Sequence, residues 1–263
     1  MDESHEQGSA AAGVRSVTRA LQILSRLTDE RTVITLRELQ DETGLARTTL
    51  IRLVATLEDH GLLWAVGGNR YAPGPGLLRW ARLASSSWEL PLESRRALRA
   101  LVETAQESAS VWVRQGVRRV CVAQEESLHA LRTVVRVGHD GPLWAGPTAR
   151  VLIRDLPDDD LAKIAAETPD GAGRLPLMRQ WQAEVREQGY AVSHGEREDA
   201  LSVIAVPLVD KDGAVTAALT LAGPTGRFGD ERLERYLSAI REAAEVISAS
   251  GFMRLGASTP SPR

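Results

Sequence analysis

The chain has 263 residues, of which 43% are hydrophobic and 25% charged, values typical of a folded globular protein. It has no run of about eighteen apolar residues that would span a membrane, and its first residues lack the basic start and apolar core of a secretory signal. The single cysteine, Cys121, and five histidines without paired spacing predict no disulfide framework, no metal site and no cofactor. We therefore expect a cytoplasmic protein, whose net charge of −3 restricts any nucleic-acid contact to a local basic surface.

The first two predicted helices lie before residue 45. One runs from Ser16, its expected N-cap, to Leu27, because apolar residues recur there at intervals of three and four. This predicted buried stripe consists of Val17, Ala20, Leu21, Leu24 and Leu27. The second helix begins at a capping box, Thr35 followed three residues later by Glu38, and Gly44 is placed to end it.

A third predicted helix follows the glycine turn and covers residues 46–57. Its inward positions are Leu50, Leu53, Val54 and Leu57. The opposite face has no carboxylate, as a surface that contacts phosphates and base edges should, and a helix in this position of a helix-turn-helix enters the major groove. The expected DNA-contacting residues on it are Arg47, Thr48, Thr49, Ile51, Arg52 and Thr56. Taken by composition alone, the same face would also suit an ordinary solvated helix.

Residues 62–66 and 70–72 read as two strands joined by the turn Gly67-Gly68-Asn69. Such a hairpin after the third helix predicts the wing of a winged helix-turn-helix. Arg70 lies at its tip and is a candidate for a phosphate or minor-groove contact, although an exposed hairpin arginine is also commonly just solvated.

The N-terminal region resembles the IclR family of bacterial transcriptional regulators. The resemblance rests on residues 13–17 with Arg19-Ala20-Leu21, 36–39, Thr43-Gly44-Leu45, Thr49 with Arg52-Leu53, Leu57-Glu58, Gly61-Leu62 and residues 71–74. It implies a winged helix-turn-helix DNA-binding domain at residues 13–74, preceded by a disordered tail at residues 1–12.

The rest of the chain predicts a helical linker and a second domain. Residues 73–76 break the hairpin, and apolar residues from Leu77 onward have helical spacing, so residues 75–90 are the expected linker helix. In residues 91–251, strands are predicted at 109–113, 119–124, 131–137, 202–209 and 214–222, with helices near 98–105, 159–166, 177–188 and 230–248. Strands grouped around hairpins, with helices to one side, favour an α+β domain with an antiparallel sheet. Residues 252–263 form an expected disordered tail.

The IclR resemblance continues through this domain at Gly138, Gly141-Pro142-Leu143, Arg186 with Gly189-Tyr190-Ala191, residues 204–207 and residues 218–224. It implies a GAF-like effector domain that binds a small molecule. Matched positions place the effector at Trp144, Ala145, Thr148, Arg150, Asp199, Val203 and Thr220. Trp144, Val203 and Thr220 would equally suit core or strand-face positions without a ligand, and Arg150 either neutralises an anionic ligand or is solvated near a helix start. Several of these differ from the usual family residue: Trp144 replaces histidine or tyrosine, Val203 a frequent cysteine, Pro147 a small residue, and Ala149-Arg150-Val151 the usual glycine-lysine-alanine. These changes favour a bulkier or more apolar effector than a small carboxylate.

The predicted function is sequence-specific regulation of transcription. We expect a repressor that the effector releases from DNA, and an activator is the alternative. The expected partners are double-stranded operator DNA, a small-molecule effector and a second copy of the chain, as a homodimer or homotetramer, and no membrane. An enzyme is disfavoured because the chain has no nucleophile elbow, phosphate loop, zinc-protease or dinucleotide motif. A ligand-sensing module that binds proteins instead of DNA is the other alternative, and the basic face of residues 47–56 speaks against it.

Overall fold

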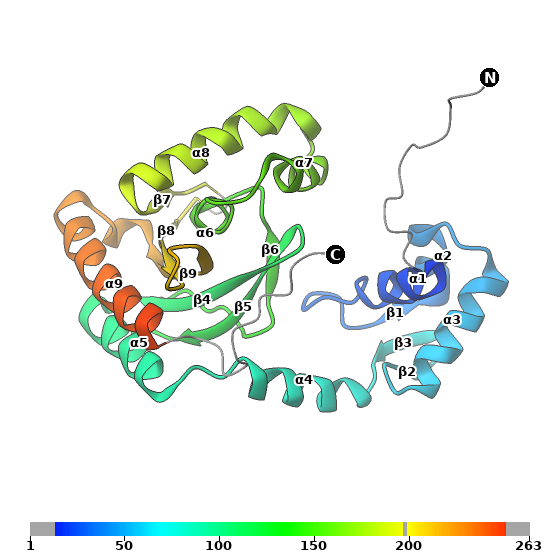
Figure 1. The fold of residues 1–263 in the computed structure, drawn as a ribbon. Coiled ribbons are helices and arrows are strands. Elements are labelled where there is room, and N and C mark those ends of the chain that lie inside the picture. The colour runs from blue at the N-terminus through cyan, green and yellow to red at the C-terminus, as the bar shows by residue number, and fades with distance from the viewer. Residues whose placement is uncertain (1–13, 197–198, 251–263) are drawn as a thin grey trace, which may run out of the picture. The chain divides into compact units, whose positions relative to one another are not determined.

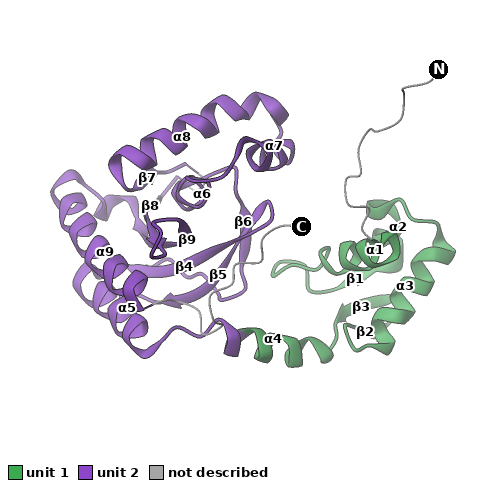
Figure 2. Cartoon of the chain, in the orientation of Figure 1, with its two compact units in different colours: residues 1–84 green, residues 85–263 purple. Residues whose placement is uncertain are grey.

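The computed structural model describes residues 14–196 and 199–250. Figure 1 shows its helices and strands, and Figure 2 its division into two compact units, residues 1–84 and 85–263. The two predicted tails, residues 1–12 and 252–263, lie outside the described residues.

The N-terminal unit is a small helical domain with a three-stranded sheet in the order β1-β3-β2. Its elements are α1 (Arg15–Leu24), β1 (Ile34–Thr35), α2 (Leu36–Thr43), α3 (Arg47–Asp59), β2 (Leu63–Gly67), β3 (Arg70–Pro73) and the greater part of α4 (Gly76–Ser87). Its core is built from buried side chains of α1, β1, α2, α3 and β2: Ile23, Ile34, Leu36, Leu39, Leu50, Val54, Leu57 and Leu63.

The predicted capping box of α2 is confirmed. The Glu38 N–H donates to the Thr35 hydroxyl at 3.1 Å, and the Thr35 N–H donates to the Glu38 carboxylate at 2.7 Å. At the other end, Gly44 has φ +64°, the left-handed conformation that glycine adopts without steric strain. The helix therefore stops where predicted, and α3 begins only three residues later.

The prediction for the first helix was wrong in its bounds and in part of its buried face. The helix begins at Arg15 after Val14, with Ser16 inside it and no side-chain cap, and it ends at Leu24. Ile23 is its buried residue, whereas Val17 and Leu21, expected to face inward, are 55% and 59% exposed. The apolar residues of α1 extend around more of its circumference than the packing against α2 and α3 covers, so one side of them remains outside the core.

The C-terminal unit is built on a six-stranded sheet in the order β6-β5-β4-β9-β8-β7, with every neighbouring pair antiparallel. Its strands are β4 (Ser108–Gln115), β5 (Arg118–Glu125), β6 (Asp140–Pro142), β7 (Ala191–His194), β8 (Leu201–Val209) and β9 (Val215–Pro224). Its helices are α5 (Leu92–Ala105), α6 (Pro147–Leu152), α7 (Asp158–Ala166), α8 (Leu175–Gln188) and α9 (Asp230–Ser250), with short 3-10 turns η1 (Gly171–Arg174) and η2 (Thr225–Arg227).

Helices cover both faces of this sheet, which corrects the prediction that they lie to one side (Figure 1). Because side chains alternate along a strand, β4 sends Val111 and Val113 toward α5 and α9 and Trp112 toward the opposite face. That second face is covered by α6, α7 and α8, which pack on small residues such as Ala205 and Ala218. The class, α+β with an antiparallel sheet, is as predicted.

Residues 131–137 form no strand, contrary to the prediction. The segment is rich in β-branched residues, and Val135 is partly buried, but Leu131, Val134 and Val137 are 69%, 52% and 53% exposed. The place beside β5 belongs instead to β6, whose Gly141 pairs with Arg119. A strand requires a neighbouring backbone as well as a suitable sequence, and the described part of the chain supplies none for this segment.

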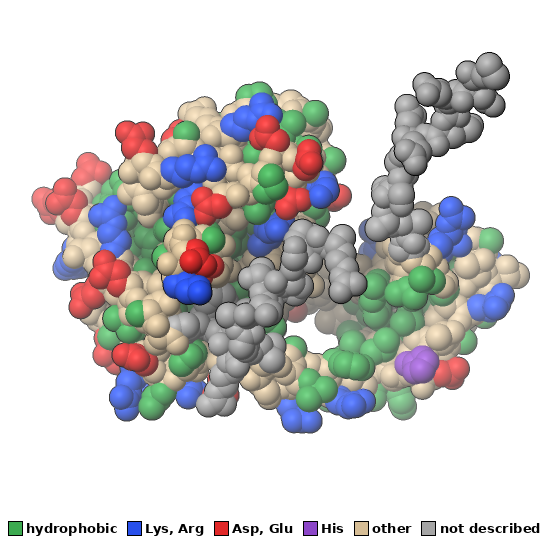
Figure 3. All heavy atoms as spheres, in the orientation of Figure 1, with side chains coloured by type: hydrophobic (Ala, Val, Ile, Leu, Met, Phe, Trp, Pro, Cys, Tyr) green, Lys and Arg blue, Asp and Glu red, His purple; other side chains and the backbone are tan. Residues whose placement is uncertain are grey.

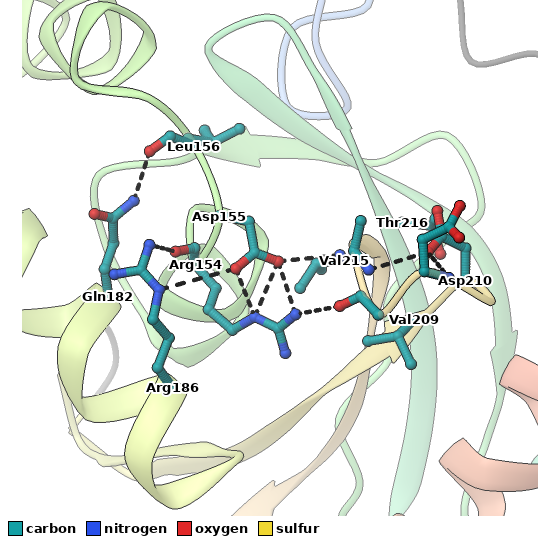
Figure 4. Close-up of polar contacts among 12 residues, drawn as sticks. Arg154, Asp155, Leu156, Gln182, Arg186, Val209, Asp210, Val215 and Thr216 are labelled. Atoms are coloured by element: carbon teal, nitrogen blue, oxygen red, sulfur yellow. Dashed lines mark hydrogen bonds and ion pairs between the residues drawn. The ribbon is translucent and has the colours of Figure 1, made fainter.

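A polar clamp holds α6 and α8 to the β8–β9 hairpin (Figure 4). The Asp155 carboxylate accepts from the Val215 N–H at 3.2 Å, and the Arg154 guanidinium donates to the Gly213 carbonyl at 2.7 Å. Arg186 on α8 donates to the Arg154 carbonyl at 2.6 Å, and Arg154 also pairs with Asp155. The clamp fixes the end of α6, whose beginning belongs to the candidate effector site.

Candidate DNA-binding and effector sites

The outward face of α3 exposes most of the residues predicted to contact DNA. Arg47, Thr48, Ile51, Arg52 and Thr56 are exposed, and Thr49 is half-buried. Their helix is anchored from behind by the buried side chains of Leu50, Val54 and Leu57. No acidic residue lies in the first turn, so the N-terminal half of α3 presents cationic and hydroxyl groups without a competing carboxylate.

The Thr56 hydroxyl makes a contact that limits the hydrogen bonds it can form with DNA. The Thr56 hydroxyl donates to the Arg52 carbonyl at 2.9 Å, so it presents lone pairs rather than a proton to an incoming ligand.

In the wing, Gly68 and Asn69 have φ of 62° and 56°, as the tightest hairpin turns require. Arg70 follows them, exposed, with its Nε donating to the Gly67 carbonyl at 3.3 Å. Among the described residues of the wing, its other guanidinium N–H groups have no hydrogen-bond partner.

Four of the predicted effector-binding residues gather at the start of α6. Trp144 is half-buried, whereas Ala145 and Thr148 are buried. Arg119, which the sequence analysis did not single out, holds this segment by donating to the carbonyls of Pro142 and Ala145 at 2.7 and 2.8 Å. The fourth residue, Arg150, has a side chain only 21% exposed.

Two more, Val203 and Thr220, lie on the sheet face beneath α6. Thr220 is 2% exposed and pairs across the strands with Ser110 on β4. The Trp112 indole donates to the Ser110 hydroxyl at 2.8 Å, and the hydroxyls of Ser110 and Thr220 lie 2.7 Å apart. This buried chain of hydrogen bonds forms the floor under α6.

The remaining predicted residue, Asp199, is exposed on the loop between β7 and β8, and it is Glu196 on that loop that reaches the site. The Glu196 carboxylate accepts from the Arg150 guanidinium at 2.7 Å and from the Gly146 N–H at 3.2 Å. Glu196 was not predictable from the sequence, because a contact between residues 46 positions apart leaves no local pattern.

Two arginines lie over the indole of Trp181 on α8. The guanidinium carbons of Arg150 and Arg174 are 5.0 and 5.5 Å from the ring centroid, within the range of cation–π attraction. Arg174 also donates to the Trp144 carbonyl at 3.4 Å. Arg150 lines a cavity of about 250 Å³ at the edge of β7, together with Tyr190, Val192, His194, Leu233 and residues of α8.

Cys121 and His139, which could in principle serve catalysis or bind a metal ion, are both packed against other residues. Cys121 is fully buried in β5, and burial raises the pKa of its thiol to about 12, which keeps it protonated and unreactive. The His139 ring packs edge-on against the Trp112 ring, with the ring centroids 6.1 Å apart. Within residues 14–196 and 199–250, no group of His, Cys, Asp and Glu side chains is arranged to hold a metal ion, and no helix is long and apolar enough to cross a membrane.

A helix-turn-helix with a wing, a helix after it, and an antiparallel-sheet domain define a DNA-binding regulator with a separate second domain. The family model for the IclR helix-turn-helix domain matches residues 16–65, and that for the bacterial transcriptional regulator IclR C-terminal domain matches residues 83–249. The chain belongs to the IclR family, whose members are transcriptional regulators and not enzymes.

Three relatives show the extent of the match. An IclR-family regulator from Rhodococcus sp. has 40% sequence identity and a TM-score of 0.62, covering 95% of this chain and 98% of that one. The transcriptional repressor IclR of Escherichia coli (strain K12) is 24% identical over 262 residues, 93% of each protein. An IclR homologue from Microbacterium hydrocarbonoxydans, solved with 4-hydroxybenzoate, shares the fold at 18% identity and a TM-score of 0.67, covering 89% of this chain and 98% of that one.

Proposed function

We propose that this regulator is a repressor that reads its operator with the exposed face of α3 and releases it when a small molecule binds the C-terminal domain. The observation that carries the proposal is the carboxylate-free exposed surface of Arg47, Thr48 and Arg52, presented directly after the α2–α3 turn. Arginine forms bidentate contacts with guanine, and threonine contacts phosphates or bases. Arg70 adds a backbone or minor-groove contact from the wing.

The exposed apolar residues of α1 and α4 support assembly with a second copy of the chain. No residue of α4 is buried, and Leu78 and Trp80 are 73% and 57% exposed. Figure 3 shows hydrophobic side chains in green beside arginines in blue over this helix. On α1, Val17 and Leu21 are exposed in the same way. Such clusters mark interfaces, and a two-fold dimer would present two α3 helices to a palindromic operator. A tetramer would pair two such dimers.

In this proposal each segment has one role. Residues 13–74 bind DNA, residues 75–90 form the linker that transmits the signal, and residues 91–251 form a GAF-like effector domain of a cytoplasmic protein. An effector that favours one arrangement of the C-terminal domains changes operator affinity by its differential binding free energy, typically about 1 to 3 kcal/mol.

The proposed effector-binding residues are Trp144, Ala145, Thr148, Arg150, Asp199, Val203 and Thr220. Trp144 provides an aromatic wall, and Val203 an apolar side chain, so an aromatic or otherwise apolar compound suits the site. The Microbacterium homologue was solved with 4-hydroxybenzoate, which is also an aromatic compound. Thr148 and Thr220 are buried under the present packing of α6, so contact with a ligand requires α6 to shift.

The test measures operator release by fluorescence anisotropy. The full chain is titrated onto the DNA upstream of its own gene, and a library of aromatic compounds is screened for release. We expect a compound that weakens binding by about tenfold, and we expect Trp144→Ala to bind the operator normally without this compound and to lose the response to it. A Trp144→Ala protein that responds like the wild type contradicts the proposed effector site.

A further inference from the structure

The Glu196 carboxylate lies beside the start of α6 and accepts from two hydrogen-bond donors there. Its two carboxylate oxygens accept from the Gly146 N–H at 3.2 Å and from the Arg150 guanidinium at 2.7 Å. The side chains of Arg150 and Glu196 are only 21% and 27% exposed. A charge-assisted hydrogen bond of this kind is stronger than one between neutral groups.

The backbone holds Glu196 in this place. Gly195 has φ +68°, and its N–H donates to the Leu201 carbonyl at 2.9 Å, which closes the loop between β7 and β8. A Cβ atom on Gly195 would lie 3.1 Å from the Asp199 carbonyl oxygen, so the turn is suited to glycine. A carboxylate tethered by so short a segment acts at an effective concentration on the order of millimolar or higher, against which a free carboxylate must compete.

The second cation of the cluster is also neutralised from within the chain. Arg174, which shares the Trp181 indole with Arg150, pairs with Asp170 at 3.2 Å. The two guanidiniums therefore face two carboxylates, Glu196 and Asp170, and the formal charges of these four side chains cancel.

Most of the backbone N–H groups at the start of α6 are absent or already donated. Pro147, the first residue of α6, has no N–H, and the N–H groups of Ala149 and Arg150 already donate to the Gly146 carbonyl. On the floor, the Trp112 N–H is donated to Ser110, and the Ser110 and Thr220 hydroxyls bond one another and the Ser110 carbonyl. The Ser110 and Thr220 hydroxyls can therefore offer a ligand only acceptor lone pairs.

We propose that Glu196 is a specificity-determining residue that excludes carboxylate effectors by holding the Gly146 N–H and the Arg150 guanidinium with its own carboxylate. The effector is then an uncharged aromatic or apolar compound, which sets this protein apart from the homologue solved with 4-hydroxybenzoate. This inference rests on the proposed effector site and specifies the charge of its ligand.

The experiment compares 4-hydroxybenzoate with its uncharged isostere, 4-hydroxybenzamide, by isothermal titration calorimetry on the full chain. We expect Glu196→Ala to raise the affinity for 4-hydroxybenzoate by at least about tenfold, the value of one charge-assisted hydrogen bond, with the affinity for the amide little changed. Adding Arg150→Ala to this variant removes the gain. The matched control is Asp170→Ala, which deletes a carboxylate from the same cluster without freeing the Gly146 N–H, and its gain in affinity for 4-hydroxybenzoate is much smaller than that of Glu196→Ala.

Two results overturn the proposal. One is a Glu196→Ala protein that binds 4-hydroxybenzoate no better than the wild type, including the case in which neither binds it. The other is an equal gain in Asp170→Ala, which would show a general effect of charge. This titration contains no DNA, so its result does not depend on the operator assay. A protein that fails to bind or release an operator contradicts the proposed function, but it does not change the measured effect of Glu196 on ligand affinity.

Discussion

The hydroxyl oxygens of Ser110 and Thr220 lie 2.7 Å apart on the neighbouring strands β4 and β9, fully beneath α6. The Trp112 indole N–H completes the chain by donating to Ser110 at 2.8 Å. Three polar groups are thereby satisfied on a sheet face whose other side chains are mostly apolar. Such a chain stabilises the domain only while every member has its partner, because an unpaired buried polar group is costly.

Thr220→Val tests this relationship with little change in side-chain volume. It removes the hydroxyl that bonds Ser110, and we expect a loss of about 1 to 3 kcal/mol in the free energy of unfolding. Urea denaturation followed by circular dichroism measures it. Thr104→Val, on the exposed side of α5, is the control and leaves the midpoint unchanged. Equal midpoints for both variants would mean that the buried hydroxyl chain contributes nothing to stability.

The clamp at Asp155 predicts a dependence of stability on pH. Burial opposes ionisation of this carboxyl, but hydrogen bonds from Arg154 and the Val215 N–H, with the charges of Arg154 and Arg186, lower its pKa below the ordinary 3.8. A lowered pKa contributes stability that is fully present above the ordinary value and is lost as the pH falls through the folded value. We expect Asp155→Asn to flatten the fall in stability below about pH 4, measured by denaturation at several pH values. A fall as steep as that of the wild type would exclude this role.

The exposed α4 predicts how the protein assembles. Trp80→Glu places a charge on the proposed interface, and we expect sedimentation velocity to show a shift from dimer toward the 28.5 kDa monomer. Leu128→Glu is the matched control, since Leu128 is 95% exposed on the C-terminal domain and lies outside this interface. A Trp80→Glu protein that sediments like the wild type would place the interface elsewhere.

Local signals predicted much of the fold because their causes are local. The Thr35–Glu38 capping box and Gly44 fix α2 within a few residues, and the turn at residues 210–213 joins β8 to β9 as expected. The buried positions of α3 followed from its helical spacing. The exposure of Leu21 and the lack of a strand at residues 131–137 were not predictable in this way, because each depends on what packs beside the segment.

The candidate effector site was predictable only in part, for the same reason. Trp144 and Arg150 were found through the family resemblance, but the six-residue helix α6 is too short for periodicity to reveal, although proline at its first position was a usable signal. The contact of Glu196 with Arg150, and the place of both arginines on Trp181, arise from segments far apart in the chain. Such contacts follow from the assembled sheet and not from any short pattern.

The most direct test of the account is the affinity of the wild type and of Arg52→Ala for the operator and for scrambled DNA of equal length, by fluorescence anisotropy across a salt series. We expect the wild type to prefer the operator by about a thousandfold or more. Arg52→Ala should lose about 1 to 3 kcal/mol of that preference while its fold is intact, whereas Arg96→Ala, on the exposed face of α5, should retain it. Equal affinity of the wild type for both DNAs, or an Arg52→Ala protein with the full preference, would contradict the reading of DNA by α3.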